Sequence, residues 1–85
     1  MTQVNYAFER RRVKTTRFGE QTFADYTENE EGRSFGYLID RLHQERMPNL
    51  SAADIERRLA QHGGFVGEWV LPEGRLARII VHAVA

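Results

Sequence analysis

The chain has 85 residues, 41% of them hydrophobic, which suffices for one small core and leaves no room for a second. Twelve Lys and Arg residues cancel twelve Asp and Glu residues, unlike the strongly basic balance of a dedicated nucleic-acid module. The absence of Cys excludes a disulfide-stapled secreted scaffold and any thiolate site. Neither a signal peptide nor an apolar run of roughly 20 residues is visible, so we expect a cytoplasmic protein with residues 1–85 as one domain.

The first third of the chain is predicted to contain strands. Residues 4–9 alternate between apolar and polar types, as in a half-buried strand, although Val4, Ala7 and Phe8 would also share one helical face. Residues 10–17 form either an exposed continuation of this strand or a solvated arm. A turn at residues 18–20 leads to a returning strand at residues 21–27, and residues 29–32 are expected to form an acidic, mobile loop.

A first helix is predicted to begin after Ser34, whose hydroxyl can accept a hydrogen bond from the first turn. Its apolar residues recur at the i, i+3, i+4, i+7 spacing of an amphipathic helix. The helix should end near Met47, because Pro48 disfavours helical geometry in the preceding residue.

A second helix is predicted over residues 51–62. Ser51 and Asp54 resemble a capping box, and Gly63 or Gly64 would supply the left-handed residue that ends the helix. Two strands then follow, at residues 65–71 and 75–84, around the turn-forming sequence Pro-Glu-Gly at residues 72–74. Residues 75–85 are apolar on both faces and are expected to form a strand that is buried on both sides.

The predicted fold class is therefore α+β: a small antiparallel sheet with two consecutive helices followed by a C-terminal β-hairpin. Within the single domain, residues 1–33 form a charged, strand-like segment, residues 34–62 the helix pair and residues 65–85 the hairpin. The expected core consists of Phe35, Leu38, Ile39, Leu42, Ile55, Leu59, Trp69, Leu76, Ile79 and Val81.

Several short motifs occur in the order found in one family of regulators. They are Phe-Gly-Tyr-Leu-Ile-Asp-Arg-Leu at residues 35–42, Leu-Ser at 50–51, Gly-Phe-Val-Gly-Glu-Trp at 64–69 and Gly-Arg at 74–75. Together they cover about half of the chain and resemble the winged-helix domain of PadR-like transcriptional regulators. A helix-to-hairpin unit within an unrelated α+β domain is the alternative.

The resemblance implies a DNA-binding surface. Residues 51–62 would be the recognition helix, with Arg57, Arg58 and Gln61 directed at the major groove. Arg75 and Arg78 would lie on or near the wing and contact phosphate. The competing interpretation of the same helix is an ordinary solvated face, in which Asp54 and Arg58 form an i, i+4 ion pair.

No combination of residues specifies a reaction or a metal site. Asp40 and His43 share a helical face but lack a third ligand nearby, and His82 is expected to be a hydrogen-bonded core residue. Tyr6, residues 10–12 and His82 are residue types that a small ribonuclease toxin would use, but a neutral chain attracts RNA poorly. We therefore expect no enzyme, no metal, no cofactor and no small-molecule substrate.

Charge is segregated along the N-terminal half, and this suggests two kinds of partner. Residues 9–17 are basic and lie between Phe8 and Phe18, which would suit stacking on single-stranded nucleic acid or contact with an acidic surface. A protein partner could instead be bound by the charged residues Arg10, Arg11, Arg12, Glu28, Glu30 and Glu31.

The expected function is thus a small non-enzymatic regulator that binds duplex DNA through a winged-helix-like helix and hairpin. The alternative is a small inhibitor or adaptor that docks on a larger protein, as phage-encoded, anti-CRISPR-like anti-defence proteins do. Only the small size of the chain and its segregated charge support that alternative. The sequence predicts no oligomeric state.

Overall fold

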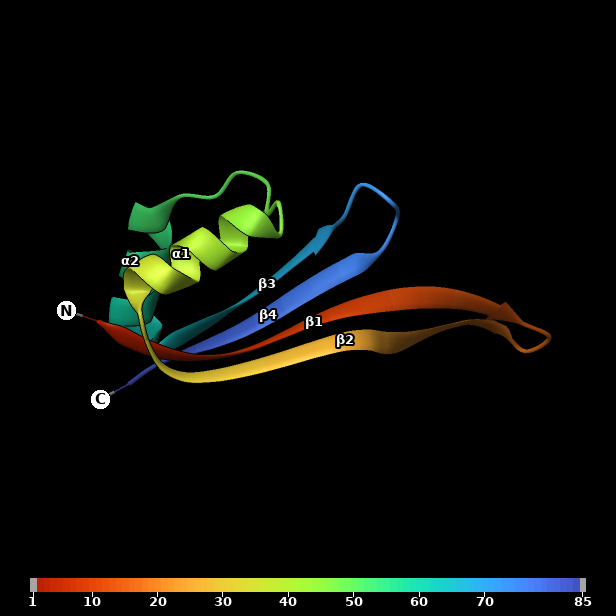
Figure 1. The fold of residues 1–85 in the computed structure, drawn as a ribbon, viewed down its shortest axis with the longest axis horizontal. Helices are drawn as coiled ribbons and strands as arrows, with labels where there is room; N and C mark the ends of the chain where they lie inside the picture. Colours follow the sequence, from red (N-terminus) through yellow and green to blue (C-terminus); the bar gives the residue numbers. More distant parts are fainter. Residues whose placement is uncertain (1, 85) are drawn as a thin grey trace.

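Four antiparallel strands form one sheet, and two helices cover one of its faces (Figure 1). The structure is a computed structural model, and it describes residues 2–84. The elements in chain order are β1 (Gln3–Thr16), β2 (Gly19–Ser34), α1 (Phe35–Gln44), α2 (Ala52–His62), β3 (Gly64–Val70) and β4 (Leu76–Ala83). The sheet order is β2-β1-β4-β3, so the first and last hairpins lie side by side through pairing of β1 with β4. The α+β class, the antiparallel sheet and the two helices are confirmed, but a long hairpin, β1–β2, precedes the helices in addition to the hairpin that follows them.

The N-terminal segment is a long β-hairpin. Residues 4–9 are strand, as predicted, and β1 continues through the basic residues to Thr16, paired with β2 throughout. The chain reverses at Arg17 and Phe18, one residue earlier than predicted, and the Thr16 hydroxyl donates to the Gly19 carbonyl oxygen at 2.8 Å.

The prediction of an acidic loop at residues 29–32 is wrong, because this segment is part of the strand β2. The register shifts by one residue between Tyr6↔Glu30 and Val4↔Arg33, so β2 carries a β-bulge here. Gly32 takes a φ of 64°, which favours glycine, and its N–H donates to Asn5 Oδ1 at 2.8 Å. Pairing with β1 therefore holds the polar segment extended.

Both helices begin where their caps predict. The Ser34 hydroxyl accepts from the Tyr37 N–H at 3.1 Å, and the Ser51 hydroxyl accepts from the Asp54 N–H at 3.3 Å. The second helix ends at Gly63, whose φ of 74° is left-handed and whose N–H donates to the Leu59 carbonyl at 2.9 Å.

The core lies between the helices and the covered face of the sheet. Seven of the ten predicted core residues are buried, namely Leu38, Leu42, Ile55, Leu59, Trp69, Ile79 and Val81. Phe35 and Ile39 pack against them while partly exposed, and Leu76 is only partly buried. The prediction omitted Val4, Tyr6, Phe8, Leu71 and Ala77, which are also buried.

The prediction that β4 is buried on both faces is wrong. Ala77, Ile79 and Val81 face the helices and are buried, whereas Ile80 and His82 alternate onto the other face, where no element covers them. His82 is exposed and is not a core histidine. We call this uncovered side of the sheet the open face.

The molecule is elongated, with extents of 49 × 23 × 20 Å, because the first hairpin projects beyond the rest of the sheet (Figure 1). Pairing of β1 with β4 stops at Arg11↔Leu76, but pairing of β1 with β2 continues to the turn. We call this two-stranded projection, residues 12–23, the arm. Within residues 2–84, neither helix is long and apolar enough to cross a membrane.

Candidate nucleic-acid interface

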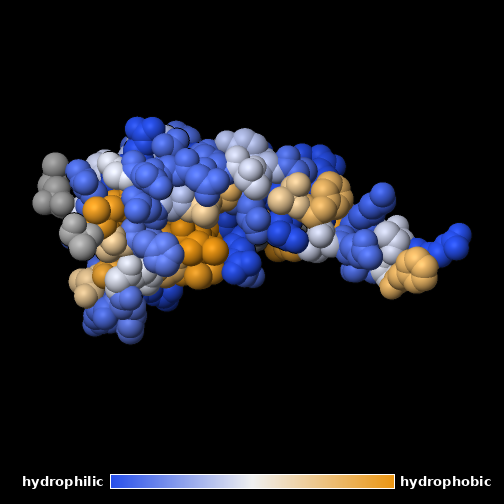
Figure 2. Space-filling view, turned by 90° about the horizontal axis from the view of Figure 1, so that it is seen from below, coloured by the Kyte–Doolittle hydropathy of each residue, from blue (hydrophilic) through white to orange (hydrophobic). Residues whose placement is uncertain are grey.

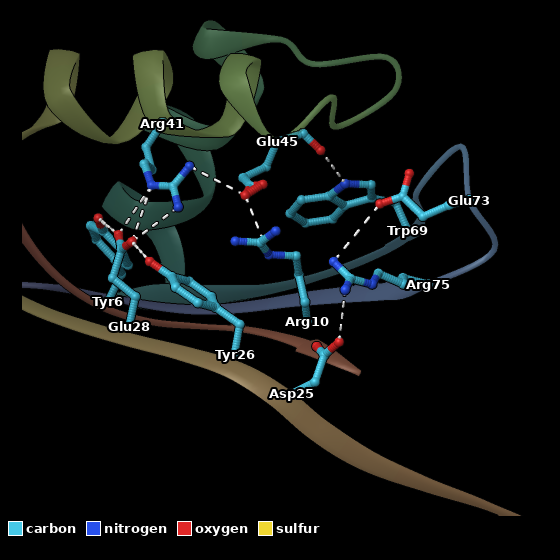
Figure 3. Close-up of polar contacts among 10 residues, drawn as sticks. All are labelled: Tyr6, Arg10, Asp25, Tyr26, Glu28, Arg41, Glu45, Trp69, Glu73 and Arg75. Atoms are coloured by element: carbon cyan, nitrogen blue, oxygen red, sulfur yellow. Dashed lines mark hydrogen bonds and ion pairs between the residues drawn. The ribbon is translucent and has the colours of Figure 1, made fainter. Parts of the chain in front are cut away.

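Glu28 lies between the sheet and α1 and is the centre of a polar network (Figure 3). Its carboxylate accepts two bonds from Arg41, from Nε at 3.1 Å and from Nη2 at 3.0 Å. The hydroxyl of Tyr26 donates to it at 2.7 Å, and the hydroxyl of buried Tyr6 donates to it as well. The network therefore ties β1, β2 and α1 together.

This arrangement fixes the protonation of its members. The Arg41 hydrogen bonds lower the pKa of Glu28 to about 2, against the opposing effect of burial. Burial first, and the Glu28 carboxylate second, raise the pKa of Tyr6 above its usual range. A proton donor with a raised pKa and a base with a lowered pKa are poorly matched to acid–base catalysis near neutral pH. The network is built to hold the fold together.

Arg10 belongs to the same buried layer (Figure 3). Its Nε lies 3.6 Å from Glu45 Oε1 at the end of α1, and its guanidinium carbon lies 4.3 Å from the centre of the Tyr26 ring. The indole N–H of Trp69 donates to the Glu45 carbonyl at 2.8 Å. Arg10, predicted as a partner contact, is thus largely committed to packing inside the domain.

Asp25 organises the base of the arm. It is an extra residue in β2, since Arg10 faces Tyr26 while Arg11 faces Ala24. Its Oδ2 lies 2.6 Å from Arg12 Nε and 3.1 Å from Arg75 Nη2, and the Arg12 hydrogen bond lowers the pKa of Asp25. Arg75, predicted to contact phosphate, is therefore held in an ion pair within the chain.

The other predicted DNA contacts lie in two places. Arg57, Arg58 and Gln61 are all exposed on α2, with Arg57 paired to Asp54. Arg78 lies on the open face, with its Nε 3.6 Å from Glu68 Oε1. The helix group and Arg78 belong to opposite sides of the sheet.

The residues predicted to contact a protein partner are also divided. Glu28 faces α1, Glu30 pairs with Arg33 at 2.9 Å, and Glu31 is exposed. Arg11 pairs with Glu9 at 3.1 Å on the open face. The three glutamates therefore do not form one exposed acidic surface.

One face of the arm carries two cations and an aromatic ring. Arg12 stands opposite Phe23 and Lys14 opposite Gln21, on the same side of the strand as Val4, Tyr6 and Phe8. Glu20, the one acid of the arm, stands opposite Thr15 and so on the other side. Among residues 2–84, no carboxylate lies within 4.0 Å of the cationic groups of Lys14 or Arg17.

Two aromatic rings are exposed on the arm, and a third, Tyr26, lies beyond its base, where Arg10 covers the ring and the hydroxyl donates to Glu28. Phe18 at the turn is 87% exposed, and Phe23 and Tyr26 are 45% and 37% exposed. Figure 2 shows the arm as a narrow, mostly hydrophilic projection with hydrophobic side chains at its end and nearer its base. We call Arg12, Lys14, Arg17, Phe18 and Phe23 the arm surface.

Sequence reasoning found part of this surface. It singled out the basic run and Phe18, but it also counted Phe8, which is buried in the core. The sequence alone gives Phe23 no role beyond its strand, because only the register of β1 against β2 places it opposite Arg12.

Residues 2–84 contain no group of three or more His, Asp or Glu residues able to hold a metal ion. The cationic and aromatic side chains of the arm surface can instead bind phosphate and stack on planar rings. No family model, curated protein or solved structure matches this chain.

Proposed function

We propose that the chain is a non-enzymatic DNA-binding protein and that the arm surface is its principal contact. One observation carries the proposal: the arm projects beyond the folded body with three cations against one acid and with Phe18 87% exposed. A β-ribbon of this kind can enter a groove or lie along a strand, while cations neutralise phosphates.

The aromatic rings favour unpaired bases within that proposal. Base–aromatic stacking needs an open base face, which single-stranded DNA offers and an intact duplex hides. Arg12 and Phe23 are cross-strand neighbours, so a nucleotide whose base stacks on the ring would place its phosphate on the guanidinium in exchange for Asp25, whose Oδ2 lies 2.6 Å from Arg12 Nε. We therefore expect a single-stranded oligonucleotide to bind more tightly than a duplex of the same sequence.

A winged-helix-like use of α2 and the β3–β4 hairpin is the second candidate. It is favoured by the exposure of Arg57, Arg58 and Gln61 on a helix that leads directly into a hairpin. It would require Arg75 to exchange Asp25, 3.1 Å away, for a phosphate. The inhibitor or adaptor role remains the alternative for a protein partner, with charge reversal at Glu30 and Glu31 as its test in a pull-down.

Fluorescence anisotropy with labelled DNA at several salt concentrations tests the proposal. With Lys14 and Arg17 contacting phosphates of a single strand, log Kd should change with log salt by a slope of about 1.4 in magnitude. Reversing Lys14 and Arg17 to Glu should abolish most of this dependence. The matched control reverses Arg57 and Arg58 to Glu, which changes the net charge equally, and it should retain tight binding.

The opposite ranking of these two double variants would favour the winged-helix-like candidate. Absence of binding to either kind of DNA at low salt would refute DNA binding by this chain.

A further inference from the structure

The open face of the sheet carries apolar and ionic rows in alternation. Opposed residues on β1, β4 and β3 define each row. The ionic row is Glu9, Arg78 and Glu68; one flanking row is Ala7, Ile80 and Val66; the other is Arg11, Leu76 and Val70.

This face is more apolar than a solvated sheet face requires. An antiparallel sheet with one face on the core normally shows polar residues on the other. Here Val66 and Val70 are 51% and 64% exposed, and Ile80 is partly exposed between them and β1. The apolar side chains flank the ionic row on both sides, a mixture of apolar and charged groups that a protein partner can bury.

Charge favours a second copy of the same chain as the occupant. The three rows hold two bases, Arg11 and Arg78, and two acids, Glu9 and Glu68, so their charges balance when two copies meet. A two-fold axis parallel to the strands and between β1 and β4 exchanges the positions of these strands. Glu9 then meets Arg78 of the second copy, and Ala7 meets Ile80 of the second copy, each contact occurring twice.

We propose that the open face is a homodimer interface in which two sheets pack face to face. Aligned sheets pack about 10 Å apart at roughly 30°, with inner side chains interdigitated. Because the axis runs along the strands, both arms project from the same end of the dimer. The inference stands on the open face alone and does not depend on DNA binding.

Light scattering coupled to size-exclusion chromatography tests the dimer. The chain should elute with twice its monomer mass of 9.9 kDa. Glu9→Arg and Arg78→Glu should each return it to the monomer mass, while Arg57→Glu on α2 should leave the dimer intact. Circular dichroism of each variant checks that the fold persists.

Mixing the Glu9→Arg and Arg78→Glu variants tests the proposed contact more specifically than either variant alone. In an equal mixture of Glu9→Arg and Arg78→Glu, the new Arg faces the new Glu across the axis, and the native Arg78 faces the native Glu9. The mixture should recover the dimer mass that neither variant shows alone. A wild-type mass of 9.9 kDa at millimolar concentration would overturn the proposal, and so would a dimer that both variants leave unchanged.

Discussion

Phe18 stands at the turn of the arm with its ring in solvent. Replacing Phe18 by Ala should weaken binding of a single-stranded oligonucleotide by about 1 to 3 kcal/mol, because one stacking platform is lost. The melting temperature should stay unchanged, since the ring contributes no burial. Val13→Ala is the matched control on the opposite side of the arm and should leave the affinity unaffected. Equal affinity of the Phe18 variant and the wild type would remove Phe18 from the interface.

The lowered pKa of Glu28 predicts how the stability of the fold changes with pH. Its pKa falls from an ordinary 4.5 to about 2 in the folded chain, so the ionised form stabilises the fold. That stabilisation is fully present above about pH 4.5 and is lost as the pH falls toward 2. Urea unfolding at a series of pH values should therefore show the free energy of unfolding decreasing through this window.

The Glu28→Gln variant should be less stable at pH 7 and should show a shallower decrease between pH 4.5 and 2. Glu31→Gln, at an exposed position of the same strand, should behave as the wild type does. A decrease of the same steepness in the Glu28 variant would mean that other groups produce it.

The roles of the residues in the polar network around Glu28, and of Asp25, could not be predicted from the sequence. Ser34 and Ser51 cap their own helices, so a local pattern reveals them. Glu28 and Arg41 are 13 residues apart, and Asp25 meets Arg75 only because β1 and β4 are paired. Their roles depend on contacts between distant segments, which composition and spacing do not encode.

Substitutions of two glycines test how closely β3 packs against β4 and how open the start of α1 is. A Cβ on Gly64, the first residue of β3, would lie 2.5 Å from the carbonyl oxygen of Val81 on the neighbouring strand. We therefore expect Gly64→Ala to lower the free energy of unfolding by about 1 to 3 kcal/mol. Gly36→Ala in α1 meets nothing within 4 Å and should raise it by up to about 1 kcal/mol. Urea denaturation of both variants measures the two signs, and a Gly64 variant as stable as the wild type would contradict the packing described.

The helices were predictable and the strands less so, for a physical reason. Both helices combine a cap with a stripe of apolar residues, and each signal lies within a dozen residues. β2 is exposed along nearly its whole length and has little apolar alternation, so residues 29–32 resembled a loop. Its extended conformation comes from pairing with β1, a case in which tertiary context decides strand formation.

At the level of the whole molecule, the arm should be separable from the fold. None of the buried hydrophobic residues lies in residues 12–23. Replacing residues 12–23 by a short turn should therefore leave the far-ultraviolet spectrum and cooperative unfolding intact while abolishing DNA binding. A shortened chain that unfolds would show that the fold depends on the arm, and one that still binds DNA with the wild-type affinity would contradict the role proposed for the arm.

The overall α+β arrangement followed from the sequence, but only part of the proposed arm surface did. The sequence pointed to α2 and the second hairpin, whereas the projecting element is the first hairpin. Its length becomes visible only once β1 is known to extend past β4.

A titration of isotope-labelled protein with a single-stranded DNA oligonucleotide, followed by amide nuclear magnetic resonance shifts, tests the central claim most directly. The account predicts that the largest shifts fall within residues 12–23, with Phe18 and Lys14 among them, and that residues 52–62 change little. Shifts concentrated on α2 and the β3–β4 turn, or no shifts at saturating DNA and low salt, would contradict it.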